Sequence, residues 1–309
     1  LGDNTTLTTS SNGSVVFAST VNGAKSLTVS TNGTGDVTMV GAVGGTTALT
    51  GLTITTDVLT APAITLATNG ALSITNGGAS EITGIISGSG VTLTKAGAGT
   101  LTLSGANTYT GATHIDVGTL KLTGSLSTST DVVMSGVAVW DLQSAQTVAT
   151  LTMASGNSIT NTAGTSSLSV NGASTLANSI TTSGAQTYTG AVTLGADLSV
   201  TTTNGAVTFS SGVTGSGKAL TVSTGSGDIA MSTIGVSGTP VGAVTLNSTG
   251  VTTLGGAVYA SSVTTNAGGS VAINTGTIAT SGNQTYNDAV ILGADLSVTT
   301  TNGAVTFSS

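Results

Sequence analysis

Apolar and hydroxyl residues alternate one for one over many short segments of the chain. Clear examples are residues 27–30, 52–55, 91–94, 101–104 and 220–223. Because successive side chains of a strand point to opposite faces, each segment has one apolar face and one hydroxyl face. No segment of helical length shows a period of 3.6 residues. The pattern therefore predicts short β-strands throughout and an all-β fold.

Asn-Gly pairs separate many of these strands, at residues 12–13, 22–23, 32–33, 69–70, 76–77, 171–172, 204–205 and 302–303. Asn and Gly accept a positive φ at low steric cost, which suits tight turns. Between two alternating runs, Asn-Gly also favours a β-hairpin. Antiparallel meander repeats or a β-sandwich are therefore the alternative fold.

A long internal repeat favours a solenoid instead. Residues 194–211 recur without a change as residues 292–309, which is 98 positions later (292 − 194 = 98). The apolar strand centres Val200, Phe209, Val222 and Met231 are separated by 9, 13 and 9 residues. Two or three strands then close a coil of about 20 residues, and we expect five coils in the 98-residue unit. The whole chain would form roughly fifteen coils of a parallel β-helix.

We expect one continuous solenoid over residues 1–309, without separate globular domains. Its predicted subdivisions are a repeat-like unit (1–89), a distinct β-strand repeat (90–124), divergent coils (125–182), the 98-residue unit (183–280) and the start of the next unit (281–309). Because the sequence begins and ends inside the repeating pattern, we expect it to be a segment of a longer protein.

The composition narrows the possible functions. Charged residues make up 5% of the chain, Arg is absent, and the four Lys are Lys25, Lys95, Lys121 and Lys218. With so few cations we expect no binding of nucleic acid, because neutralising phosphates requires Lys and Arg. Hydrophobic residues reach 38%, which argues against disorder. No stretch has the length of a membrane helix, so we expect no membrane insertion of this segment.

Residues 90–122 carry a more specific signal. The motifs are Leu-Thr-Lys-x-Gly-x-Gly-Thr-Leu at 93–101, Leu-Ser-Gly-x-Asn-Thr-Tyr-Thr-Gly at 103–111, and Gly-Thr-Leu at 118–120. This segment resembles the autotransporter-associated β-strand repeat of bacterial passenger regions. The flanking units resemble the repeats of filamentous-haemagglutinin-like surface proteins. Both resemblances imply a right-handed parallel β-helix, export across a Gram-negative envelope and an extracellular or cell-surface location.

The Asn-Thr-Tyr element of this repeat recurs in weaker form. It reappears as Gln-Thr-Tyr-Thr-Gly at 186–190 and as Gln-Thr-Tyr-Asn-Asp at 284–288. The last copy lacks the Gly, so we expect its turn to differ.

The titratable residues do not form an evident active site. His114 is the only histidine, and the chain has no Cys, which disfavours a zinc site. Asp36 and Asp228 occupy equivalent places, and Asp197 and Asp295 are repeat mates. Because repeat mates would lie about five coils apart, we interpret these acids as turn residues that accept backbone N–H bonds.

We therefore predict no catalytic, cofactor-binding or metal-binding residue. Asp and Asn oxygens leave calcium binding at the turns open, although the calcium-binding nonapeptide is absent.

The aromatic residues have two interpretations. Phe17, Phe209 and Phe307 occupy related places, where a filler of the core is favoured over a binding platform. The alternation leaves the face of Trp140 undetermined. Runs such as residues 201–203 and 53–55 raise ice binding as an alternative, but Thr is mixed with Ser and Asn and is better explained as a neutral residue facing solvent.

The predicted function is structural and adhesive: an extended segment of a secreted bacterial surface fibre or stalk. Its expected partners are neighbouring coils, further copies of itself by end-to-end or side-by-side association, and glycans or receptors on host or sister cells. A self-assembling matrix or sheath filament is one alternative. A carbohydrate-active β-helix enzyme is another, but it is disfavoured because such enzymes need clustered acids with Arg or Lys.

Overall fold

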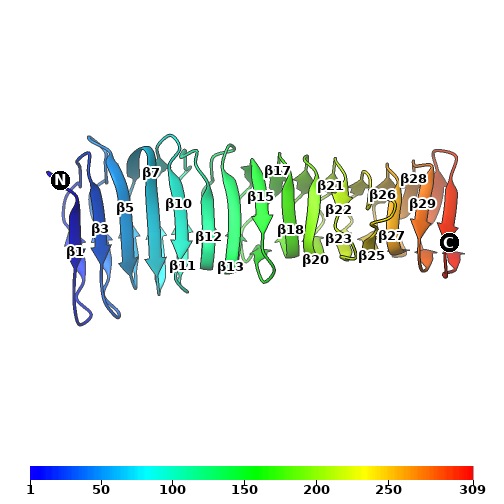
Figure 1. The fold of residues 1–309 in the computed structure, drawn as a ribbon, viewed down its shortest axis with the longest axis horizontal. Coiled ribbons are helices and arrows are strands. Elements are labelled where there is room, and N and C mark those ends of the chain that lie inside the picture. Colours follow the sequence, from blue (N-terminus) through cyan, green and yellow to red (C-terminus); the bar gives the residue numbers. More distant parts are fainter. Residues whose placement is uncertain (309) are drawn as a thin grey trace. The chain divides into compact units, whose positions relative to one another are not determined.

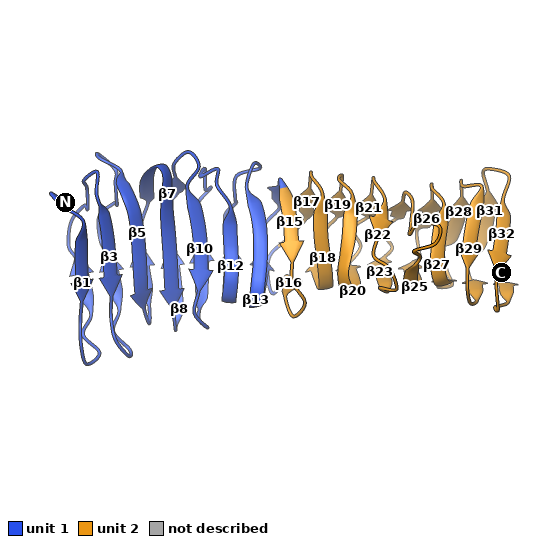
Figure 2. Cartoon of the chain, viewed as in Figure 1, with its two compact units in different colours: residues 1–149, 162–164 blue, residues 150–161, 165–309 orange. Residues whose placement is uncertain are grey.

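The fold is all-β, as the alternation predicts. The computed structural model describes residues 1–308, and these contain 33 strands and no helix, hence no helix that could cross a membrane. The chain divides into two compact units, residues 1–149 with 162–164 and residues 150–161 with 165–309 (Figure 2). Each unit is a right-handed parallel β-solenoid whose coils have three faces.

In unit 1 the strands of successive coils pair in register on each face (Figure 1). Face 1 holds β1 (Thr5–Thr8), β3 (Ser26–Ser30), β5 (Leu49–Thr56), most of β7 (Ile64–Asn76), β10 (Thr92–Ala96) and the first halves of β12 (Thr113–Leu122) and β13 (Asp131–Leu142). Face 2 holds β2 (Val15–Phe17), β4 (Val37–Met39), β6 (Leu59–Ala61), β8 (Ala79–Ile82), β11 (Thr100–Leu103) and the second halves of β12 and β13. Face 3 is the least regular and includes the start of β7, β9 (Ile86–Ser87) and β14 (Gln146–Val148).

Unit 2 repeats the arrangement with more regular faces. Face 1 holds β15 (Thr150–Met153), the first halves of β18 (Ser174–Thr182) and β20 (Val192–Thr202), β22 (Val213–Thr214), the start of β27 (Val258–Thr265), β29 (Thr277–Thr280) and β32 (Ser297–Thr300). Face 2 holds β16 (Ser158–Thr160), the second halves of β18, β20 and β27, β23 (Leu220–Gly225), β25 (Val241–Ser248), β30 (Gln284–Tyr286) and β33 (Val305–Phe307). Face 3 holds β17 (Leu168–Val170), β19 (Gln186–Tyr188), β21 (Val207–Phe209), β24 (Ile229–Met231), β26 (Val251–Leu254), β28 (Ser270–Ile273) and β31 (Ala289–Leu292).

The coils are roughly 20 residues long, which confirms the predicted period. The separation of paired residues in neighbouring coils varies, from Leu49 and Leu66 (66 − 49 = 17) to Leu27 and Leu52 (52 − 27 = 25). The named strands pair in parallel, so the antiparallel alternative is wrong. Asn-Gly pairs form corners between faces rather than hairpins.

The core of each unit consists of the inward-facing alternate residues. On face 1 of unit 1, Leu27, Leu52 and Leu72 form one aliphatic ladder and are fully or almost fully buried. Burying these aliphatic side chains between coils contributes about 1.5–3 kcal/mol each, less the entropy of ordering the chain. Stability therefore comes from contacts between neighbouring coils.

Side chains at the corners connect each coil to the next. Asp36 Oδ1 accepts a hydrogen bond from the backbone N–H of Val58, at 3.1 Å, and Asp228 Oδ1 accepts one from Val251, at 2.8 Å. Asn12 Oδ1 does the same for Thr34, at 3.1 Å. This confirms the predicted turn role of Asp36 and Asp228, since their carboxylates accept hydrogen bonds from equivalent backbone N–H groups.

The 98-residue repeat does not span five whole coils, and that expectation is wrong. Val192 lies on face 1 of unit 2, whereas its repeat mate Val290 lies on face 3. The average coil in this part of the chain is slightly longer than a fifth of the repeat, so the repeat stops one face short of five turns. The subdivisions at residues 89, 124, 182 and 280, and the single continuous solenoid over 1–309, stay predictions.

Candidate functional surface

The segment 93–122 forms more than one coil of unit 1. One inward position on its first strand is occupied by a lysine, which is a cationic residue. Lys95 follows Leu93 by two residues and stands in the inward ladder between Ile74 and Ile115. Its side chain is fully buried. The alternation of strand β10 places Lys95 on the same face as Leu93. The sequence alone therefore identifies Lys95 as an inward residue.

The Lys95 ammonium lies against backbone oxygens at the corner of the coil. Nζ donates to the carbonyl oxygens of Ala96, Gly97 and Val117 at 2.9, 2.7 and 3.1 Å. The first two oxygens belong to its own coil and the third to the next coil. Burial lowers the pKa of Lys95 from 10.5 to about 8. The side chain therefore acts as a structural clamp between coils, and the surrounding groups are carbonyls rather than reactive partners.

Lys95→Met should change how stability depends on pH. Between pH 8 and 10 the unfolded chain keeps a proton on Lys95 that the folded protein releases, so the unfolding free energy of the wild type should rise with pH. The expected rise is about 2 kcal/mol. Lys95→Met should lack this part of the rise, measured by denaturant unfolding at pH 7, 8, 9 and 10. Parallel pH curves for the two proteins would contradict the assignment.

A second corner of the same segment is built from Asn107 and Tyr109. Asn107 Nδ2 donates to the carbonyl oxygens of Gly105 and Ser125, each at 3.0 Å, and its Oδ1 accepts from the N–H of Ile86 at 2.9 Å. The Tyr109 hydroxyl lies 2.6 Å from Thr113 Oγ1 inside the core, and burial raises the Tyr109 pKa. The segment's polar motif residues therefore satisfy buried backbone and hydroxyl groups.

The last Gln-Thr-Tyr copy makes different side-chain contacts after its Tyr, and a difference in its turn stays a prediction. Asn287 Nδ2 donates to the carbonyl of Thr265 at 2.7 Å, and Asp288 Oδ1 accepts from the N–H of Gly269 at 2.8 Å. Both partners belong to the preceding coil. In the earlier copy, Gly190 instead leaves room for the backbone of Gly172.

The structure does not gather the acids and the histidine into a site. His114 lies at an outward position of face 1 in unit 1, between Thr94 and Val133. Asp197 Oδ1 accepts from the N–H of Ala219 at 2.9 Å, as a turn residue does. Within residues 1–308 no three His, Asp or Glu side chains are close enough to hold a metal ion.

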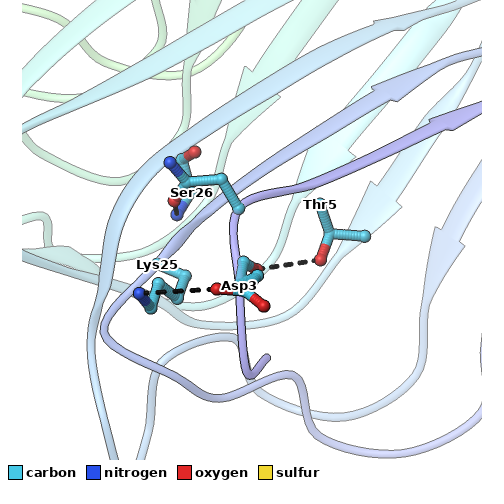
Figure 3. A network of polar contacts seen from close by, with 5 residues as sticks. Asp3, Thr5, Lys25 and Ser26 are labelled. Carbon is cyan, nitrogen blue, oxygen red and sulfur yellow. Dashed lines mark hydrogen bonds and ion pairs between the residues drawn. The ribbon is translucent and has the colours of Figure 1, made fainter.

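An exposed ion pair lies near the first strand of unit 1. Lys25 Nζ lies 3.9 Å from Asp3 Oδ1, and both side chains are exposed (Figure 3). Nearby, Thr5 Oγ1 donates to the carbonyl of Asp3, at 3.0 Å. An exposed pair at this distance contributes little to stability.

The aromatic side chains mostly fill the core. Trp140, whose face the sequence left open, is fully buried and pairs in register with Leu120. Phe209 is also buried and stacks on Tyr188 with ring centroids 4.7 Å apart. Phe307 stacks on Tyr286 at 5.1 Å but remains 54% exposed, and Phe17 is half-buried. The core interpretation holds for Phe209, and the pairing with a Tyr was not foreseen.

The most regular surface feature is a file of hydroxyl groups on face 2 of unit 2. One outward position carries Ser or Thr in eight successive coils: Ser158, Ser179, Ser199, Thr221, Thr245, Thr264, Thr285 and Thr306. Neighbouring hydroxyls stand about 4.8 Å apart along the file. We call these eight residues the hydroxyl file. The equivalent position of face 3 is interrupted by Ala230, Ala272 and Ile291.

A protein-family model matches the segment that carries the Leu-Thr-Lys and Asn-Thr-Tyr motifs. Residues 93–122 match the passenger-associated-transport-repeat, a repeat of autotransporter passengers. This confirms the resemblance of the segment. Comparisons with curated proteins and with solved structures gave no significant match. The repeat and the β-solenoid fold together support a surface-associated passenger region, in a protein that is secreted or exposed at the cell surface.

Proposed function

We propose that this chain is a structural and adhesive segment of a bacterial surface fibre, and that it acts by binding rather than by catalysis. The observation that carries the proposal is the hydroxyl file, which offers eight equivalent uncharged groups on one face of unit 2. Hydroxyls donate and accept hydrogen bonds, so the face suits neutral glycans. Each contact is weak, and their number gives avidity.

Replacing hydroxyls of this face should weaken adhesion. In the triple variant Thr221→Ala, Thr245→Ala, Thr264→Ala, we expect at least about a tenfold loss of binding to immobilised neutral glycans, because adjacent weak contacts multiply in effect. The measurement is retention of protein-coated beads on a glycan array.

The matched control carries the same three changes on face 3: Thr187→Ala, Thr208→Ala, Thr253→Ala. Both triples lose equal β-propensity and equal numbers of hydroxyls, so circular dichroism and unfolding should not distinguish them. Equal retention of the two variants, or no retention of the wild type, would reject the adhesive face.

Self-assembly into filaments is the second candidate, because a solenoid coil that no other coil covers has unpaired edge strands that can pair with another chain. Leu194 and Phe209 are buried under the following coil, whereas their repeat mates Leu292 and Phe307 are 61% and 54% exposed. Leu292 and Phe307 also line an open recess of about 880 Å³. A following coil or a second copy stacked on this recess would bury the same side chains.

The purified 309-residue chain should therefore associate as its concentration rises. Leu292→Lys with Phe307→Lys should shift the average mass in light scattering toward the monomer, because two cations resist burial. Val137→Lys, at a 72% exposed position of unit 1, is the control for lost surface hydrophobicity. Concentration-independent mass of the wild type would exclude stacking through this recess.

A further inference from the structure

Tyr259 differs from the other tyrosines because its side chain points away from the core. It lies at an outward position of face 1 in unit 2 and is half-buried. The hydroxyls of Tyr109, Tyr188 and Tyr286 form hydrogen bonds inside the core. The Tyr259 hydroxyl has no hydrogen-bond partner among residues 1–308. The ring and the hydroxyl of Tyr259 are therefore available to a ligand.

A turn projects from the solenoid beside Tyr259. On face 1, Ile234 pairs with Val258, 24 positions later, whereas Val213 pairs with Ile234, 21 positions later (258 − 234 = 24; 234 − 213 = 21). Within this longer coil, residues 236–240 are exposed and turn back on themselves through a short antiparallel bridge. The N–H of Tyr259 donates to the carbonyl of Ile234 at 2.7 Å, so the turn starts directly next to the tyrosine.

The turn and the strand that carries Tyr259 border an open recess of about 280 Å³. Gly238 and Pro240 line it from the turn, and Tyr259, Ala279 and Thr299 line it from face 1. The last three occupy one outward position in three successive coils. We call this space the Tyr259 recess. The side chain next to the tyrosine in the following coil is only a methyl group, which leaves the space beside the ring open.

The lining of the Tyr259 recess combines an aromatic ring with hydroxyls and contains no charged residue. Thr299 and Thr301 are exposed and add two hydroxyls to that of Tyr259. A pyranose ring has an apolar C–H face that packs on an aromatic ring, and its hydroxyls exchange hydrogen bonds with side-chain hydroxyls. The recess is slightly smaller than the about 300–1,000 Å³ of sites for drug-sized ligands, which suits one sugar ring.

We propose that the Tyr259 recess binds a single neutral pyranose ring of a glycan, stacked on the Tyr259 ring with its hydroxyls near Thr299 and Thr301. An acidic sugar is disfavoured because no cation lines the recess to pair with its carboxylate. The inference rests on the proposed function because both name a neutral glycan, but the recess shares no residue with the hydroxyl file. It adds one discrete sugar site to the repeated weak contacts of face 2.

Binding in the recess can be followed through the tyrosines. The chain has four Tyr, and fluorotyrosine incorporation gives each a fluorine NMR resonance, with that of Tyr259 identified by its loss in Tyr259→Phe. The probes are the methyl glycosides of glucose, galactose, mannose and N-acetylglucosamine, with methyl glucuronide as the charged probe. We expect at least one neutral glycoside to shift the Tyr259 resonance saturably, with a Kd of about 1 mM.

The resonances of the three core tyrosines should stay in place during the titration. The proposal is overturned if no neutral glycoside shifts the Tyr259 resonance. Tighter binding of the glucuronide than of every neutral glycoside would also overturn it, because the site would then select a charged sugar.

A matched pair of variants tests the recess without changing Tyr259. Ala279→Leu should fill the space beside the ring and weaken binding of the same glycoside about tenfold or more. Ala272→Leu makes the same change at an outward position of face 3 and should leave the affinity unchanged. Unchanged core resonances show that both variants are folded. Equal affinities of the two variants would overturn the proposal.

The outcome is separable from that of the adhesive face. The triple variant Thr221→Ala, Thr245→Ala, Thr264→Ala should keep the shift of the Tyr259 resonance, because it leaves the recess intact. Loss of bead retention therefore rejects the adhesive face without changing this titration. A Tyr259 resonance that never moves, in a wild type that still retains beads, rejects the recess alone.

Discussion

Gln186→Leu should destabilise unit 2 by about 3–5 kcal/mol, because it leaves several buried polar groups without partners. The Gln186 side chain is fully buried, and its Nε2 lies 3.1 Å from Thr182 Oγ1 and 3.0 Å from the carbonyl oxygen of Thr201. Its Oε1 accepts the hydroxyl proton of Tyr188 at 2.7 Å. Leucine has a similar volume but neither donates nor accepts. The midpoint of urea unfolding should fall accordingly.

Two companion variants separate the network from the loss of packing. Tyr188→Phe removes one hydroxyl and should cost only about 1–2 kcal/mol, since the amide keeps its carbonyl partners. In the double variant, the cost should be smaller than the sum of the two single costs, because both changes remove the same hydrogen bond. An additive double variant, or a Gln186→Leu cost below that of Tyr188→Phe, would show that the network does not stabilise the coil.

Gly118→Ala should cost about 3–5 kcal/mol in unit 1, for steric reasons. Gly118 has a φ of 75°, where residues with a side chain are strained. A Cβ there would lie 2.4 Å from the carbonyl oxygen of Gly97 and 2.6 Å from that of Gly99. These oxygens belong to the backbone of the preceding coil, so relieving the overlap requires two coils to separate. Thermal unfolding should show the loss.

Two other glycines separate the cost of the steric overlap from the cost of the backbone conformation. Gly217 has a φ of 70° with no atom within 4 Å of a built Cβ, so Gly217→Ala should cost about 1–2 kcal/mol for the backbone alone. Gly45 has neither a left-handed φ nor a close contact, and Gly45→Ala should be neutral or slightly stabilising. If Gly118→Ala cost no more stability than Gly217→Ala, close approach of the coils would not be the cause of the loss.

Much of the fold can be predicted from particular residues. The alternation in 27–30 and 52–55 predicts strands with an inward aliphatic file, and the structure places Leu27 against Leu52 in that file. The equivalence of Asp36 and Asp228 predicts a turn role, and each accepts a backbone N–H from the next coil. These features depend on side-chain parity and on short turns, which are local properties of the chain.

The buried polar groups were harder to predict. Lys95 occupies an inward position that parity alone could have identified, but its three carbonyl partners come from two coils. Gln186 reaches the carbonyl of Thr201, fifteen residues later, only because the corner brings that residue beside it. The residues that a side chain contacts in the next coil depend on the register between strands, and no single strand determines that register.

The sequence by itself determined the strand content, the approximate coil period, the scarcity of charge and the resemblance of residues 93–122 to a passenger repeat. Only the tertiary structure decided that coils have three faces and that the repeat makes four and two-thirds coils. The physical reason is that differences in coil length accumulate along the chain. Corners of varying length set the length of each coil, so a small error in the assumed period adds up over several coils and moves a repeat mate to another face.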